Sequence, residues 1–129
     1  MVFSYKSDLV VKIQITLIAI ALISSPATGN NMSSSALYTC CFEVFGKVQG
    51  VFFRKYTERK ANTLGVRGWC VNTINGTVKG ELEAPLIPLN QMKHWLETKG
   101  SPASVIERVE FTPTKQIEQY SFNGFVIKK

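Results

Sequence analysis

Residues 43–54 read EVFGKVQGVFFR and connect a predicted strand to a predicted helix through a loop that contains Gly46 and Gly50. Before the loop, every second residue is apolar, which is typical of a strand with one buried face. These residues are Tyr38, Cys40, Phe42 and Val44. After the loop, apolar side chains recur at helical spacing between residues 53 and 64, and Gly65 ends the pattern. The loop therefore leads from a strand into the N-terminus of a helix.

Further elements follow this unit along the chain. They are the predicted strands 66–73 and 77–84, the predicted helix 89–99, and the predicted strands 105–111 and 120–127. Asn75-Gly76 separates the first two of these strands, and this dipeptide is typical of a tight antiparallel hairpin. Gly100 ends the helix, and the polar residues 112–116 are expected to form a turn.

The order of the predicted elements, βαββαβ with a short extra strand, favours the α+β fold class. Two crossovers around a hairpin pack both helices on one face of an antiparallel sheet of four or five strands, which is the ferredoxin-like sandwich. The chain has 129 residues, enough for one compact hydrophobic core. We therefore expect one domain over residues 37–129, preceded by an N-terminal extension over residues 1–36.

The glycine loop and the residue that follows it are typical of an anion site. Free N–H groups at a helix N-terminus, with the positive end of the helix dipole, favour a phosphate group. Arg54 stands in the first turn, where its planar guanidinium can bind two oxygens of the same anion. The candidate phosphate-binding loop consists of Gly46, Lys47, Val48, Gln49, Gly50, Val51, Phe52 and Phe53. Because no Lys-Ser/Thr pair follows Gly50, the loop differs from that of nucleoside triphosphatases.

Composition narrows the range of partners. The chain has 15 Lys and Arg against 9 Asp and Glu, a formal net charge of +6, which favours anionic partners in general. Its three cysteines lack the CxxC spacing and support neither a disulfide framework nor a thiolate zinc site. We expect no metal site, and the cysteines are interpreted as small hydrophobic residues.

The extension leaves the location of the protein open. Residues 13–23 are uncharged and apolar, two lysines precede them, and small residues follow, as in a signal peptide or a short membrane anchor. Initiation at Met32 is the alternative and predicts a cytoplasmic protein, whereas a functional segment 1–31 predicts a secreted or membrane-anchored one. Asn31 and Asn75 lie in sequons that become glycan acceptors only on the secretory route. A membrane partner is expected only if the segment is retained.

Residues 43–57 and 65–78 together resemble the signature blocks of the acylphosphatase family. The first block is EVFGKVQGVFFR followed by Tyr56-Thr57, and the second is GVRGWCVNT followed by Gly76-Thr77-Val78. The similarity extends over residues 37–129. It implies the hydrolysis of small acyl phosphates to a carboxylate and inorganic phosphate, without a metal or a cofactor. It also implies that Arg54 binds the phosphoryl group with the loop amides, and that Asn72 positions the attacking water.

Two alternatives come from other functional classes. RNA-recognition domains share the βαββαβ order, but residues 77–83 lack the stacking aromatics that RNA binding requires, so no nucleic-acid partner is expected. A non-catalytic anion-binding domain of the same fold remains open. The only histidine, His94, is assigned no chemistry, and the size of the chain predicts a monomer. Trp69 and Phe53 are expected to belong to the hydrophobic core.

Overall fold

The computed structural model describes residues 36–129, so the predictions on the signal-like segment, Met32 and Asn31 lie outside the described residues. The described part consists of two helices and six strands. They are β1 (Leu37–Lys47), α2 (Phe53–Leu64), β2 (Arg67–Asn72), β3 (Val78–Pro85), α3 (Leu86–Thr98), β4 (Val105–Phe111), β5 (Lys115–Ile117) and β6 (Phe125–Ile127). No helix within residues 36–129 is long and apolar enough to cross a membrane.

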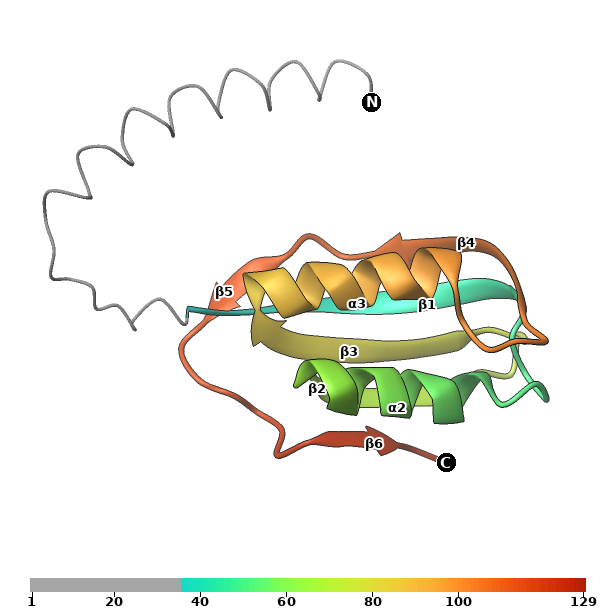
Figure 1. Ribbon diagram of the computed structural model, residues 1–129, viewed down its shortest axis with the longest axis horizontal. Coiled ribbons are helices and arrows are strands. Elements are labelled where there is room, and N and C mark those ends of the chain that lie inside the picture. The colour runs from blue at the N-terminus through green and yellow to red at the C-terminus, as the bar shows by residue number, and fades with distance from the viewer. Residues whose placement is uncertain (1–35) are drawn as a thin grey trace, which may run out of the picture. The chain divides into compact units, whose positions relative to one another are not determined.

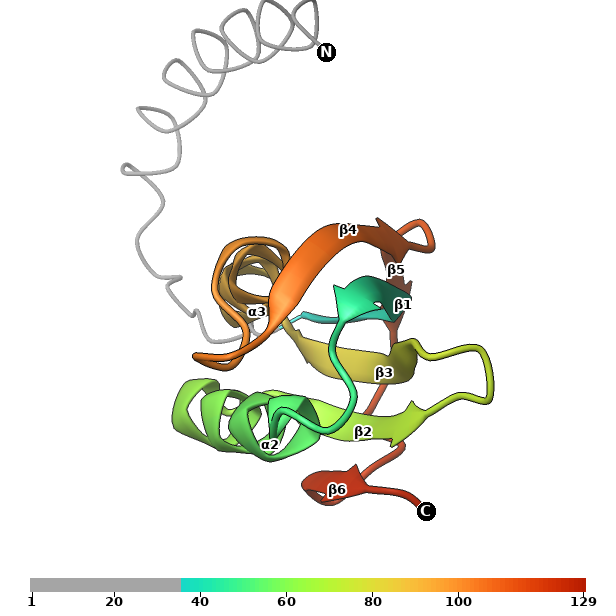
Figure 2. The ribbon, with the colours of Figure 1, turned by 90° about the vertical axis from the view of Figure 1, so that its right-hand side faces the viewer.

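One sheet carries both helices on the same face (Figure 1 and Figure 2). Its strand order is β4-β1-β3-β2-β6, with β5 also paired to β1. The four strands β4-β1-β3-β2 are antiparallel to their neighbours. The expected α+β, ferredoxin-like fold is therefore confirmed.

The alternation in β1 places its apolar residues under the helices. Cys40, Phe42 and Val44 are at most 3% exposed, whereas Cys41 between them is exposed. Side chains along a strand point to opposite faces, so one register selects the whole buried set. The helices close this core from the other side with Phe53, Ala61, Leu89, Met92 and Leu96.

The predicted hairpin is present, with Asn72 of β2 opposite Val78 of β3. Gly76 has a φ of 89°. Thr73 organises the turn, because its hydroxyl accepts hydrogen bonds from the amides of Asn75 and Thr77. Gly80 lies further along β3, where an added Cβ would lie 2.1 Å from the carbonyl oxygen of Trp69. A side chain at this position would therefore push the two strands apart.

The C-terminal part of the sheet differs from the prediction. A final strand was expected over residues 120–127, but β6 has only three residues and pairs parallel to β2, so the sheet is mixed. Residues 121 and 122 make other hydrogen bonds: both amides donate to Glu83 Oε1, at 2.8 and 3.3 Å. The carbonyl of Phe122 accepts from Arg67 Nη1 at 3.1 Å. Since side chains hold these backbone groups, they are not available for strand pairing.

Two smaller predictions were also wrong. Residues 112–116 were expected to form a turn, but Lys115–Ile117 form β5, which pairs with Leu37–Thr39 of β1. Trp69 was expected in the core, but it is only half-buried and its indole Nε1 donates to Glu81 Oε1 at 3.3 Å. The ammonium of Lys128 lies 4.1 Å from the centre of the same ring. Trp69 therefore belongs to the sheet face opposite the helices.

Substitution of Leu89 by Ala should lower the free energy of unfolding by about 2–5 kcal/mol, because a fully buried side chain is removed from a packed core. Ile87→Ala, on the same helix at a position that is 73% exposed, should change it by less than about 0.5 kcal/mol. Urea denaturation of both variants measures the difference. Equal effects would contradict the core described above.

Candidate active site

The loop between β1 and α2 leads into a helix N-terminus that has no side-chain cap. Gly50 and Phe52 have φ values of 76° and 61°, in the left-handed region. Within residues 36–129 no side chain caps α2, and its first turn contains no acidic residue. The first amides of α2 are therefore free donors at the positive end of the helix dipole, which is the arrangement that attracts an anion.

Arg54 lies in a pocket beside this helix start. The pocket has a volume of about 440 Å³ and is lined by Val48, Gly50, Phe52, Phe53, Arg54, Lys55, Ile127 and Lys129. The structure thus brings Arg54 together with four residues of the predicted loop and with the end of β6. Lys55 is already ion-paired with Glu58 at 3.0 Å. Arg54 has no ion pair of its own among residues 36–129.

The remaining residues of the predicted phosphate-binding loop do not line the pocket of Arg54. Gly46 is still part of β1 and lies at a bulge against β4, where an added Cβ would come within 2.1 Å of the carbonyl oxygen of Val105. Lys47, the last residue of β1, is exposed. Val51 belongs to the hydrophobic core, and so does Val48 although it also lines the pocket. Gln49 points towards the β2–β3 hairpin.

Gln49 ties the loop to the hairpin. Its Nε2 donates to the carbonyl oxygens of Thr73 and Thr77, at 2.8 and 2.9 Å. A side-chain amide nitrogen carries two hydrogens, so these two bonds use its donor capacity fully. Thr73 directly follows Asn72, the last residue of β2. One side chain of the loop therefore sets the distance between the loop and the strand end that carries Asn72.

Asn72 has an unusual buried oxygen. Its Oδ1 is shielded from solvent and has no hydrogen-bond partner among residues 36–129. An unpaired buried acceptor of this kind costs about 1–3 kcal/mol. Asn72 does not line the pocket of Arg54. It shares a face of β2 with Cys70, two residues earlier.

The positive charge of Arg54 affects the pKa of the Cys70 thiol. Burial raises the pKa of the Cys70 thiol to about 12, and the guanidinium of Arg54 opposes this rise. The geometry agrees, because Ile127, which lines the pocket of Arg54, pairs with Cys70 of β2. Burial likewise raises the pKa of the Cys40 thiol to about 11. Both thiols remain protonated at neutral pH, which makes them poor nucleophiles.

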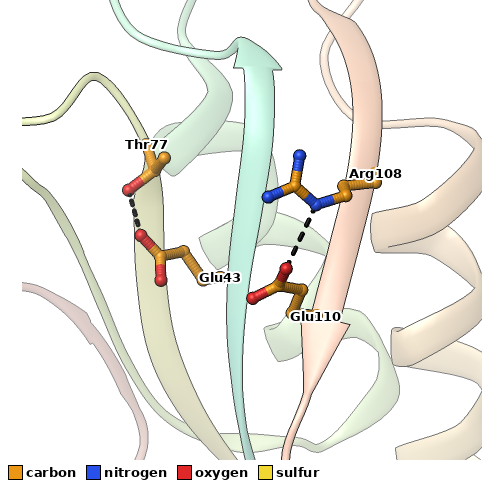
Figure 3. A network of polar contacts seen from close by, with 4 residues as sticks. All are labelled: Glu43, Thr77, Arg108 and Glu110. Atoms are coloured by element: carbon orange, nitrogen blue, oxygen red, sulfur yellow. Dashed lines mark hydrogen bonds and ion pairs between the residues drawn. The ribbon is translucent and has the colours of Figure 1, made fainter.

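A chain of hydroxyl groups extends from the hairpin to β1. The Oγ1 atoms of Thr73 and Thr77 are 2.7 Å apart, and Thr77 Oγ1 donates to Glu43 Oε2 at 2.6 Å. Figure 3 shows this contact beside the ion pair of Arg108 and Glu110 on β4, whose N–O distance is 3.1 Å. Because Glu43 accepts from Thr77, the hydroxyl of Thr77 accepts from Thr73.

Sequence reasoning did not assign these roles to Gln49, Glu43, Thr73 and Thr77. Gln49 was expected to contribute its backbone amide, and its side-chain contacts span 24 and 28 residues along the chain. No spacing rule connects such distant positions. Among residues 36–129 no three His, Cys, Asp or Glu side chains gather closely enough to hold a metal ion.

These features define a ferredoxin-like α+β domain with a basic pocket at the start of its first helix. The family described as Acylphosphatase matches residues 40–127. Acylphosphatase-1 of Drosophila melanogaster is 50% identical over 97 residues, which are 75% of this chain and 81% of that protein. Acylphosphatase-1 of Homo sapiens is 44% identical over 95 residues, 74% of this chain and 96% of that protein.

A solved structure agrees with these relatives. The acylphosphatase from Bacillus subtilis superimposes with a TM-score of 0.66 at 26% sequence identity, over 71% of this chain and 99% of that one. The chain belongs to the acylphosphatase family. The expected family and enzyme class, a hydrolase of this family, are thereby confirmed.

Replacing Gln49 by Ala should lower the free energy of unfolding by about 1–3 kcal/mol, because two hydrogen bonds worth about 0.5–1.5 kcal/mol each are lost, although each carbonyl keeps a backbone donor, Gly76 N for Thr73 and Thr73 N for Thr77. Gln91→Ala, at an exposed position of α3, is the matched control and should change it by less than about 0.5 kcal/mol. Urea denaturation measures both. An unchanged free energy of unfolding in Gln49→Ala would contradict the conclusion that Gln49 stabilises the contact between the loop and the hairpin.

Thiol labelling tests the burial of the cysteines. Cys41 is exposed, whereas Cys40 and Cys70 are buried and have raised pKa values. At pH 8 we expect a disulfide reagent such as dithionitrobenzoate to react quickly with one thiol per chain, and with all three after denaturation. Fast reaction of a second thiol in the native protein would be incompatible with this packing.

Proposed function

We propose that this chain hydrolyses the carboxyl–phosphate bond of acyl phosphates without the help of a metal ion. Water attacks phosphorus, the bond from phosphorus to the acyl oxygen breaks, and a carboxylate leaves. For a dianionic acyl phosphate the products are RCOO⁻ and H₂PO₄⁻, so both hydrogens of the water remain on the phosphate. Membership of the acylphosphatase family supports the reaction class.

In this proposal, Arg54 and the amides at the start of α2 bind the phosphoryl group. Phosphoryl transfer requires in-line positioning and stabilisation of charge on the equatorial oxygens. A guanidinium supplies two parallel donors, and the uncapped N-terminus of α2 supplies backbone donors without any reorganisation. These groups supply the positive charge that a metal ion provides in other phosphoryl-transfer enzymes.

Asn72 orients the attacking water in the same proposal. A carboxamide is neutral at ordinary pH, so Asn72 positions water by hydrogen bonds and is not a general base. The unpaired, buried Oδ1 of Asn72 is an acceptor suited to one O–H of a water molecule. The proton of that water passes to a phosphate oxygen of the substrate. A carboxylate is a good leaving group and needs little protonation.

The bond pair from Gln49 is the observation that carries the proposal. It joins the loop that leads into α2 to the residue next to Asn72. Figure 1 places the β1–α2 loop and the β2–β3 hairpin at the same end of the sheet. A phosphoryl group held at the helix start would therefore lie near the end of β2, and Ile127 of the Arg54 pocket pairs with Cys70 of the same strand.

Hydrolysis of benzoyl phosphate by the full chain tests the reaction. We expect turnover that is unchanged by a metal chelator. Arg54→Ala should lower turnover at least 100-fold and weaken competitive inhibition by inorganic phosphate, and Arg54→Lys should not restore activity, because an ammonium lacks the two-donor fork. Asn72→Ala should lower turnover by a similar factor while phosphate inhibition changes little.

Two matched controls and two contrary results complete the test. Arg59→Ala on the exposed side of α2 and Asn90→Ala on α3 should leave turnover unchanged. Equal loss of phosphate inhibition in Arg54→Ala and Asn72→Ala would contradict the separate roles. Phosphate binding by the full chain without any hydrolysis would support the alternative, a non-catalytic anion-binding domain of the same fold.

A further inference from the structure

The side chain of Phe52 is largely exposed to solvent and lies outside the hydrophobic core. Its ring is 76% exposed, whereas the adjacent Phe53 is 1% exposed and packs against Trp95. Phe52 is not a member of the hydrophobic core or of the apolar residues packed against it. A large apolar ring is thus kept in solvent at the start of α2.

The backbone of Phe52 makes the ring still more unexpected. Phe52 is the only non-glycine residue with a positive φ among residues 36–129, at 61°. This left-handed conformation is unfavourable for a bulky side chain and easy for glycine. The helix uses only the backbone at this position, where the carbonyl oxygen accepts from the amide of Tyr56 at 3.0 Å. Glycine would therefore adopt this backbone conformation more easily, and the aromatic side chain needs another explanation.

The position of Phe52 suggests one. Phe52 lines the same pocket as Arg54, and Ile127 at the end of β6 contributes a second apolar side chain to its wall. A substrate anchored at Arg54 by one end would present its other end to this apolar part of the pocket. Flat unsaturated groups stack well on aromatic rings.

We propose that Phe52 is a specificity-determining residue that binds the acyl group of the substrate together with Ile127. The inference rests on the proposed function, in which the phosphoryl end is held by Arg54 and the loop amides. It predicts that aromatic acyl phosphates are favoured over acetyl phosphate. An acetyl group has only one methyl group to bury, whereas a benzoyl group covers the face of the Phe52 ring.

The experiment compares kcat/KM for benzoyl phosphate and for acetyl phosphate in the full chain. A change in phosphoryl binding affects both substrates alike, so it cancels in the ratio of the two kcat/KM values of one variant. The two substrates also differ in intrinsic reactivity, and this difference cancels when the ratio of a variant is divided by that of the unchanged protein. Phe52→Gly removes the ring and relieves the backbone, and Phe52→Ala removes the ring alone. Both should lower the ratio by about threefold to tenfold, the range typical of one aromatic contact.

Further variants separate the ring from the loop backbone. Phe52→Tyr keeps an aromatic ring and should retain the ratio, and Ile127→Ala should lower it in the same direction. Ile87→Ala removes an equally exposed apolar side chain on α3, outside this pocket, and should leave both activities unchanged. A ratio that is the same in Phe52→Gly, Phe52→Ala and the unchanged protein would overturn the inference while the hydrolase function stands. Absence of hydrolysis of both substrates by the unchanged protein would instead overturn the proposed function.

Discussion

Two hydrogen bonds from one side-chain nitrogen connect the two halves of the candidate site. Gln49 Nε2 donates to the carbonyls of Thr73 and Thr77, so the loop before α2 is hydrogen-bonded to both ends of the β2–β3 turn. The hydroxyl chain from Thr73 through Thr77 to Glu43 braces the same hairpin against β1. Catalysis by positioning depends on such constraints, since an error of about 1 Å in the placement of reacting groups costs on the order of 100-fold in rate.

Contacts on the sheet face opposite the helices hold the C-terminal segment that carries Ile127 to the pocket. Glu83 is 1% exposed and accepts from two consecutive amides of the C-terminal segment, and Arg67 stacks on the ring of Tyr120 at 3.6 Å. These contacts set where the chain turns back into β6. Parallel pairing of β6 with β2 then places Ile127 opposite Cys70 and at the pocket. A buried carboxylate on one face of the sheet thus helps to position Ile127, a pocket-lining residue at the end of the sheet.

Three local features near the β1–α2 loop are energetically unfavourable for the folded protein. The uncapped N-terminus of α2, the unpaired Asn72 Oδ1 and the left-handed Phe52 each raise the free energy of the folded protein. A left-handed conformation alone costs about 1–2 kcal/mol. All three features lie around one end of the sheet, while the core under the helices is closely packed. Such a distribution is expected where polar groups are arranged to meet a ligand.

Periodicity and turn chemistry were sufficient to predict the βαββαβ order, the hairpin at Asn75-Gly76 and the buried face of β1, because these features depend on residues close together in the chain. The signature residues around Arg54 and Asn72 likewise predicted the family. By contrast, the short parallel β6, the added β5 and the bonds of Gln49 and Glu83 depend on contacts across 24 to 39 residues and more. A long-range hydrogen bond leaves no periodic trace in a sequence, since its partners are chosen by the folded sheet, so these features became visible only in three dimensions.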